Sequence, residues 1–173
     1  MTKKRPHYLV DGYNLIHVWQ EINTDDLATA REFLIRSLQE YGAYENFEIT
    51  LVFDAARSEE DERVENYDDF FRVIYSAFNV SADSVIERLS YEQVRKNREV
   101  HVVSSDATIE TVILGAGAYR HPSTEFYRAI KRAKKHLRKE YLGNVTLPVK
   151  RNEVADRIGA EIFAKLEKLR RAR

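Results

Sequence analysis

Short apolar runs alternate with amphipathic helical segments along the first 141 residues, and this order constrains the fold more strongly than any other feature of the sequence. The runs are too short for helices and end at polar or turn residues, so they predict buried strands. They cover residues 7–11, 48–53, 71–75 and 100–103. Strands that alternate with helices predict a central, mainly parallel sheet with helices on both faces. We therefore expect an α/β fold of three α/β/α layers, with a sheet of about four to five strands.

Apolar residues at helical spacing predict the helices in this part of the chain. The predicted helices cover residues 24–40, 81–96, 108–114 and 122–141. Residues 55–69 are polar and strongly acidic, and they predict an excursion or flexible loop. A linker over 142–148 precedes a last predicted helix, which Asn152 caps. The predicted organisation is a domain at 1–148 and a basic C-terminal helix at 149–173, packed on the domain or extending from it.

The composition excludes several classes of protein. The chain has no cysteine, which rules out disulfides, a cysteine nucleophile and cysteine-ligated zinc, and which fits a cytoplasmic location. No apolar run approaches the roughly 18 residues of a membrane span, and the N-terminus lacks the apolar segment of a signal peptide. No Gly-x-x-x-x-Gly-Lys phosphate loop is present, so we expect no nucleotide cofactor.

Charge is divided along the chain although its total is zero. Residues 120–173 hold 16 of the 28 Lys and Arg residues but 6 of the 28 Asp and Glu residues, a net charge of +10. Residues 1–119 hold the remaining 12 and 22, a net charge of −10. This division indicates an acidic body that attracts metal cations beside a basic region that attracts polyanions, although solvated helix faces produce the same pattern.

Carboxylates follow three of the predicted strands at the point where each strand ends: Asp11, Asp54 and Asp106. In an open parallel sheet, ligands bind beyond the carboxyl ends of the strands, so these side chains should meet at one edge. Asp83 joins them if its helix begins at that edge, and Glu87 lies one turn further on the same helical face. Clustered carboxylates repel one another and need a cation or a proton to coexist. Such oxygen ligands suit Mg²⁺ or Mn²⁺, and these ions activate bound water and stabilise charge on phosphate.

The polar residues also have structural interpretations. An Asp after a strand often caps the following helix, and Asp83 has the position of an acid in a first helical turn. Asn14 either tolerates left-handed backbone in a turn or orients a metal-bound water or a phosphate. Ser104 and Ser105 either cap the next helix or donate hydrogen bonds to a phosphate.

Three acidic motifs resemble those of NYN domains, which are nucleases related to the PIN domain. They are Val10-Asp-Gly-Tyr-Asn-Leu-Ile16, Ala82-Asp-Ser-Val-Ile-Glu-Arg-Leu89 and Val103-Ser-Ser-Asp106. The segment Gly115-Ala-Gly-Ala118, followed by Ser123 and Phe126, resembles the YacP-like branch of the family. The match in order and spacing extends over residues 7–140, which is most of the chain.

The resemblance implies a PIN-like fold and a metal-dependent endoribonuclease, which in the YacP-like branch cleaves mRNA on the ribosome. The catalytic positions implied by the motif match are Asp11, Asn14, Asp83 and Asp106. The three aspartates would be the ligands of Mg²⁺ or Mn²⁺, with Asp54 and Glu87 as further candidates. The family has Gln four residues beyond the Asp of the third motif, whereas this chain has Glu110, which either adds a carboxylate to the site or faces solvent.

Basic residues gather in the helix predicted after the third motif, where seven Lys or Arg residues fall within 128–139. Cationic side chains on phosphates give affinity for nucleic acid without sequence specificity. The candidate RNA-binding residues are Ser105, Arg128, Lys131, Lys134, Lys135 and Arg138. A solvated amphipathic helix explains the same charges without a ligand.

The leading functional hypothesis is a cytoplasmic, metal-dependent endoribonuclease whose partners are mRNA and, by the resemblance, the ribosome. The alternative is a non-catalytic RNA- or ribosome-binding module with the same fold, but binding alone does not need a cluster of mutually repelling carboxylates. A phospho-acceptor receiver domain would need a second acid beside Asp11, where Gly12 stands. A haloacid-dehalogenase-type phosphatase would need an Asp at the position of Tyr13.

Overall fold

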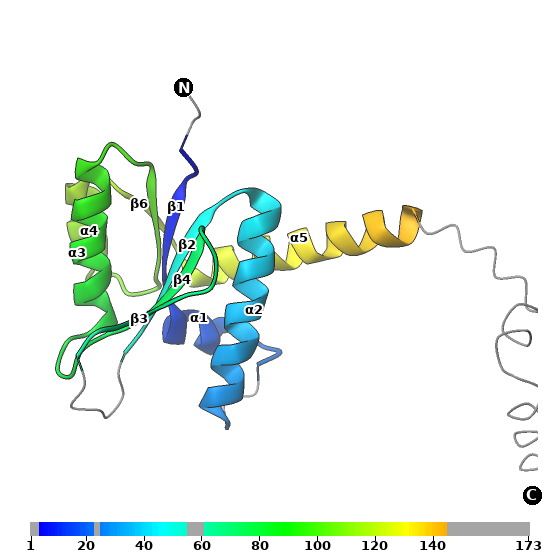
Figure 1. Ribbon diagram of the computed structural model, residues 1–173, viewed down its shortest axis with the longest axis horizontal. Coiled ribbons are helices and arrows are strands. Elements are labelled where there is room, and N and C mark those ends of the chain that lie inside the picture. Colours follow the sequence, from blue (N-terminus) through cyan, green and yellow to red (C-terminus); the bar gives the residue numbers. More distant parts are fainter. Residues whose placement is uncertain (1–3, 23–24, 55–60, 145–173) are drawn as a thin grey trace, which may run out of the picture. The chain divides into compact units, whose positions relative to one another are not determined.

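A computed structural model describes residues 4–22, 25–54 and 61–144 of the chain, with side chains through residue 140 (Figure 1). In these residues one six-stranded sheet has the strand order β3-β4-β2-β1-β5-β6. The strands are β1 (His7–Asp11), β2 (Glu48–Phe53), β3 (Arg63–Asn66), β4 (Phe71–Tyr75), β5 (Val100–Val103) and β6 (Tyr119–His121). Neighbouring strands are parallel except β3 and β4, which are antiparallel. The predicted α/β fold with a mainly parallel sheet is confirmed.

Helices cover both faces of the sheet (Figure 1). They are α1 (Gly12–Val18), α2 (Leu27–Glu45), α3 (Ala82–Arg95), α4 (Glu110–Ala116) and α5 (Ser123–Asn144). One apolar core lies between the sheet and α1, α2 and the first turns of α5, and the other lies between the sheet and α3 and α4. Along β1, Val10 belongs to the first core and Leu9 to the second, because successive side chains of a strand point to opposite faces.

The chain divides into two compact units, residues 1–136 and 137–173. The sheet, α1 to α4 and the part of α5 up to His136 belong to the first unit. The predicted boundary after residue 148 and the final helix capped by Asn152 lie outside the described residues. Among the helices of the described ranges, none combines the length and the apolar character that crossing a bilayer requires.

Three elements differ from those expected from the sequence. Residues 63–66 form β3 inside the stretch that was predicted as an excursion or loop, because an exposed strand at the edge of a sheet needs no buried apolar pattern. β6 has three residues, too few to show a pattern. With these two strands the sheet has six strands rather than the expected four to five. Residues 12–18 form α1, which is absent from the predicted helices, because the Asp11 side chain accepts a hydrogen bond from the Asn14 N–H and caps the helix.

The first turn of α1 lies directly against the carboxyl end of the sheet. A Cβ atom at Gly12 would lie 2.3 Å from the Phe53 ring, so only glycine allows this approach. β1 is flanked by β2 and β5, with Asp11 beside Val52 and Val10 beside Val103. The three strands therefore end at the same level, and the residues that follow them share one edge of the sheet.

Candidate active site

Four aspartates converge at this edge from four different elements. Asp11 ends β1, Asp54 follows β2, Asp83 lies in the first turn of α3 and Asp106 follows β5. The charges of Asp83 and Asp54 both raise the pKa of Asp11, and the charges of Asp106 and Asp54 raise the pKa of Asp83. The four side chains are thus electrostatic neighbours. The structure brings together the four aspartates that the topology of the predicted sheet placed at one edge.

Asp11 is the most deeply buried of the four carboxylates, with 9% of its surface exposed. Burial, together with the charges of Asp83 and Asp54, raises its pKa to about 6. The backbone N–H of Asn14, 3.0 Å from Oδ1 of Asp11, opposes this increase by stabilising the charged form. Near neutral pH the carboxylate is therefore ionised at a cost, and a proton or a cation relieves that cost.

Asp83 has a buried oxygen without a hydrogen-bond partner among the described residues. Burial raises its pKa first, and the charges of Asp106 and Asp54 raise it further. Its Oδ1 atom is buried and accepts no hydrogen bond from any residue that the structure describes. The start of α3 is held in place by Asp54, whose Oδ1 accepts a 2.6 Å hydrogen bond from the Ala82 N–H. A buried carboxylate oxygen that accepts no hydrogen bond and lies near three other acids is a favourable ligand for a cation.

Asp106 differs from Asp11 and Asp83 because its charge is stabilised locally. Hydrogen bonds from Thr108 hold the pKa of Asp106 below its ordinary value, and the Thr108 N–H lies 2.8 Å from Oδ1. The Asp106 N–H in turn donates to Oγ of the buried Ser104 at 3.1 Å. The loop after β5 therefore presents a carboxylate that remains ionised when Asp11 is protonated.

Asn14 ties three segments of the chain together beside the aspartates. Its side-chain oxygen accepts hydrogen bonds from the Ser105 N–H and from Oγ of Ser123, both at 3.1 Å. The Ser123 N–H donates to Oγ of Ser105 at 3.3 Å. Asn14 thereby joins α1 to the loop after β5 and to the start of α5. These contacts give Asn14 and Ser105 a positioning role in addition to the substrate contacts predicted from the sequence.

In the described ranges no three His, Asp or Glu side chains lie close enough together to form a complete metal site. Mg²⁺ is commonly held by one or two carboxylates, with waters and substrate phosphate completing its shell. The paired acids and the orphaned oxygen of Asp83 fit that mode of binding. The residues that would hold such an ion, directly or through bound water, are Asp11, Asp83 and Asp106, with Asp54 beside them.

Comparisons with known proteins agree with this geometry. The chain matches the YacP-like NYN domain family over residues 8–171. It belongs to this family. The curated relative "Uncharacterized protein YacP" of Bacillus subtilis (strain 168) is 28% identical over 172 residues, which cover 94% of this chain and 95% of the relative. Membership confirms the predicted resemblance, gives the chain a nuclease-like fold and indicates a nuclease-type, RNA-related function.

Two crystal structures of Rae1 (YacP) from Bacillus subtilis are similar to this YacP-like chain. One covers 95% of this chain and 94% of its own at 27% identity, with a TM-score of 0.67. The other, of a tryptophan-to-leucine mutant, covers 87% of this chain and 90% of its own at 27% identity, with a TM-score of 0.69. The similarity covers most of both chains, so the fold is that of the YacP-like family.

Two further candidate ligands of the YacP-like chain differ from the four aspartates in their interactions. Glu110 forms an ion pair with Arg120 on β6, with Nη1 of Arg120 3.2 Å from its Oε2 atom. Glu87 lies on α3 one turn beyond Asp83, and its charge does not contribute to the raised pKa of Asp11 or Asp83. The electrostatics therefore link neither glutamate to Asp11 or Asp83, and their role as ligands stays a prediction.

Arg120 is a residue of this site that sequence reasoning missed. Its charge helps to lower the pKa of Asp106, and its buried Nε has no hydrogen-bond partner among the described residues. The arginine therefore borders the carboxylates from β6 while it pairs with Glu110. The strand β6 is too short to be predicted, so no pattern in the sequence indicated that Arg120 lies here.

The candidate RNA-binding residues of α5 are not equivalent. Lys131 forms an ion pair with Glu21, with Nζ 2.5 Å from Oε1. Lys134 donates to Oγ of Ser37 at 2.9 Å, and its ammonium lies over the rings of Trp19 and Phe33. Lys131 is exposed despite its ion pair, as are Arg128, Lys135 and Arg138, whereas Lys134 is partly buried.

Proposed function

We propose that this YacP-like protein is a metal-dependent endoribonuclease that cleaves mRNA in the cytoplasm, in association with the ribosome. The observation that carries the proposal is the pair of Asp11 and Asp83. Asp11 is buried and Asp83 is partly buried, the charge of Asp83 raises the pKa of Asp11, and the buried Oδ1 atom of Asp83 has no hydrogen-bond partner among the described residues. A binding module gains nothing from such an arrangement, whereas a divalent cation would relieve the repulsion.

Mg²⁺ or Mn²⁺ is the proposed cofactor, and Asp11, Asp83 and Asp106 are its proposed ligands. When bound, the ion supplies an activated water and stabilises charge on the phosphodiester. Neighbouring residues of the chain prepare the site. Asn14 holds the loop after β5 and the start of α5 beside the carboxylates. Arg120, which borders Asp106, would attract a backbone phosphate toward a site that otherwise repels it.

Incubation of end-labelled mRNA with the full-length protein tests the proposal. The mRNA is supplied free or in translating ribosome complexes, with Mg²⁺, with Mn²⁺ or with EDTA. We expect new RNA ends in the ribosome complexes with either ion and none with EDTA. Cleavage that persists in EDTA would contradict metal dependence, and equal cleavage of free mRNA would contradict the role of the ribosome.

The non-catalytic alternative is distinguished in the same assay. A binding module would associate with the RNA or the ribosome and produce no new ends under any condition. Glu92→Gln provides a matched control, because Glu92 is exposed on the same helix as Asp83 and pairs with Arg88 at the surface. This variant should cleave like the wild type.

A further inference from the structure

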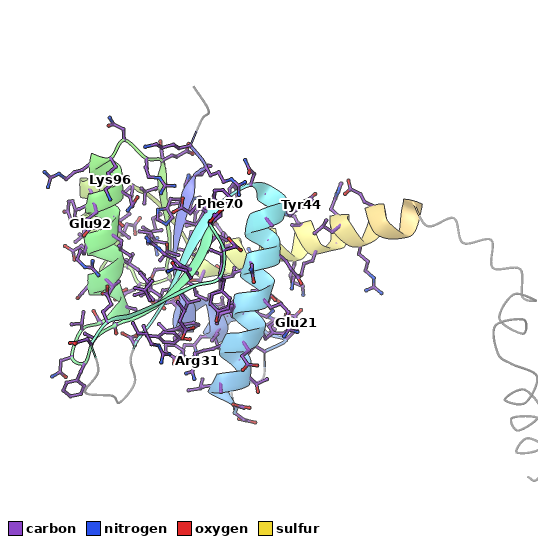
Figure 2. The ribbon with its side chains drawn as sticks, viewed as in Figure 1. Glu21, Arg31, Tyr44, Phe70, Glu92 and Lys96 are labelled. Atoms are coloured by element: carbon purple, nitrogen blue, oxygen red, sulfur yellow. The ribbon has the colours of Figure 1, made fainter. Side chains whose placement is uncertain are left out.

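A basic pocket lies at the amino end of the sheet, opposite the four aspartates. It has a volume of about 700 Å³. Its walls come from the segment before β1, the starts of β2 and β4, and the end of α3. The lining residues are Lys4, Arg5, Glu48, Phe70, Arg72, Gln93, Lys96 and Arg98. Figure 2 shows Lys96 and Phe70 toward the end of the sheet at which the first strand begins.

The charge of this pocket is opposite to that of the sequence around it. Five of its lining residues are cationic, although residues 1–119 carry a net charge of −10. Glu48 is the one carboxylate among the described residues of the wall, and it already forms an ion pair with Arg98. Four cations therefore face the pocket in excess of its own carboxylate. Unbalanced cations brought together from three segments of the chain indicate a site for a polyanion.

The pocket is built on buried contacts rather than on mobile surface side chains alone. Thr50 Oγ1 is buried and accepts a 2.9 Å hydrogen bond from Nε of Arg72. Nε2 of the buried His7 lies 2.8 Å from the same oxygen atom. Burial, opposed by the charge of Glu48 and assisted by the charges of Arg98 and Arg72, lowers the pKa of His7 to about 4. The guanidinium of Arg72 is thus held at the pocket wall, and the histidine behind it is neutral.

An exposed aromatic ring completes the wall. Phe70 is 41% exposed, and the guanidinium of Arg5 lies 3.4 Å from the centre of its ring. Proteins that bind single-stranded nucleic acid combine a cationic groove for the backbone with aromatic rings on which bases stack. Acidic peptides would use the cations but have no need of the ring. The combination therefore favours RNA over an acidic protein segment.

We propose that this pocket binds the phosphate backbone of an RNA strand, with Arg72 and Lys96 on phosphates and Phe70 beside a base. It is a second RNA contact of the molecule, remote from the carboxylates that repel phosphate. The assignment rests on the proposed function only in taking RNA as the polymer. It does not depend on cleavage.

The test measures RNA binding in EDTA, so that a failure of the nuclease proposal leaves the result interpretable. Fluorescence anisotropy of a short labelled single-stranded RNA gives the affinity of the full chain as a function of salt. The variant Arg72→Gln/Lys96→Gln removes two phosphate contacts, so the slope of log K against log salt should become shallower by about 1.4. Arg95→Gln is the matched control, because Arg95 is exposed on α3 next to Lys96 but does not line the pocket.

An unchanged affinity and slope in the double variant, with an unchanged urea midpoint, would overturn the proposal. A labelled polyglutamate peptide and inorganic pyrophosphate serve as competitors. If either displaces the RNA at the concentration at which unlabelled RNA does, the pocket recognises acidic peptide or small polyphosphate, and the assignment to RNA is wrong. Phe70→Ala should weaken RNA binding without changing the salt slope, because stacking carries no charge.

Discussion

The four aspartates of the site occupy similar places in the topology but differ in ionisation. Burial raises the pKa of Asp11 to about 6, whereas hydrogen bonds from Thr108 lower the pKa of Asp106. Burial and the charges of its acidic neighbours raise the pKa of Asp83. The side chain of Asp54 accepts a hydrogen bond from the start of α3. The site therefore combines a carboxylate that is ionised at a cost with one that is ionised readily.

Asp11 should make the stability of the metal-free protein depend on pH. Its pKa rises from the ordinary 3.8 to about 6 on folding. Between these values the folded state binds more protons than the unfolded state, so stability falls as pH rises. Asp11→Asn removes this effect. The free energy of unfolding of the variant, minus that of the wild type, should therefore increase by on the order of 2 kcal/mol from about pH 4 to about pH 7. Urea unfolding in EDTA measures this, and a difference that does not vary with pH would contradict the raised pKa.

Asn14 should matter for stability as well as for activity. Asn14→Ala removes the acceptor of two hydrogen bonds and leaves the Ser105 N–H and the Ser123 hydroxyl without it, at a cost of roughly 1–3 kcal/mol. Asn14→Asp keeps an acceptor but adds a charge to the acidic site, so it should bind Mn²⁺ differently from wild type. Urea unfolding and calorimetry separate the two effects. An Asn14→Ala variant as stable as wild type would show that these hydrogen bonds are not needed for the fold.

At the level of elements, the junction between β1 and α1 places the site. Asp11 ends the strand and caps the helix, and Gly12 lets the helix begin in contact with Phe53. The next strand in the sheet, β5, delivers the loop that Asn14 holds. One strand-to-helix turn therefore sets the position of the first carboxylate and of the residue that organises its surroundings.

One glycine substitution tests this junction, and a second glycine substitution serves as its matched control. Gly12→Ala would place a Cβ atom 2.3 Å from the Phe53 ring, and such overpacking should cost about 1–3 kcal/mol. Gly115→Ala in α4 meets nothing within 4 Å and should be neutral or stabilising by about 0.5–1 kcal/mol. Thermal or urea unfolding of both variants checks the contrast. Equal stability of the two variants would mean that α1 does not need its close approach to β2.

At the level of the whole molecule, charge is organised more finely than the division along the chain indicates. Residues 1–119, which are acidic overall, include a basic pocket. In the basic helix α5, two lysines form contacts within residues 1–136. Net charge along the sequence therefore predicts an affinity for polyanions. It does not identify which cations face them.

The exposed cations of α5 should contribute more to RNA binding than the paired ones. Arg128→Gln/Lys135→Gln should make the salt dependence of RNA binding shallower by about 1.4 in log K against log salt. Lys131→Gln/Lys134→Gln removes contacts with Glu21 and Ser37, so it should mainly lower stability. Anisotropy titrations in EDTA and urea unfolding measure both variants. A larger change of slope in the second variant would contradict the assignment.

Much of the fold was predictable because the buried strands appear as short apolar runs and the larger helices carry apolar residues at helical spacing. The convergence of Asp11, Asp54 and Asp106 followed from parallel topology alone. The elements that were not predicted depend on contacts with other segments of the chain. β3 is an exposed strand at the edge of the sheet, and α1 depends on a helix cap and on one close contact with Phe53. Arg120 escaped for the same reason, because its place beside Asp106 follows from the pairing of β6 with β5.

The most direct test of the proposed nuclease site compares single-turnover cleavage of mRNA in ribosome complexes by wild type, Asp83→Asn and Glu92→Gln in Mg²⁺. Asp83→Asn keeps the size of the side chain and removes one of the repelling charges, so it should remain folded with an unchanged or higher urea midpoint. We predict that Asp83→Asn loses cleavage by at least about 100-fold, while Glu92→Gln keeps the wild-type rate. A folded Asp83→Asn variant that cleaves at the wild-type rate would contradict the central claim that these carboxylates hold the catalytic metal ion.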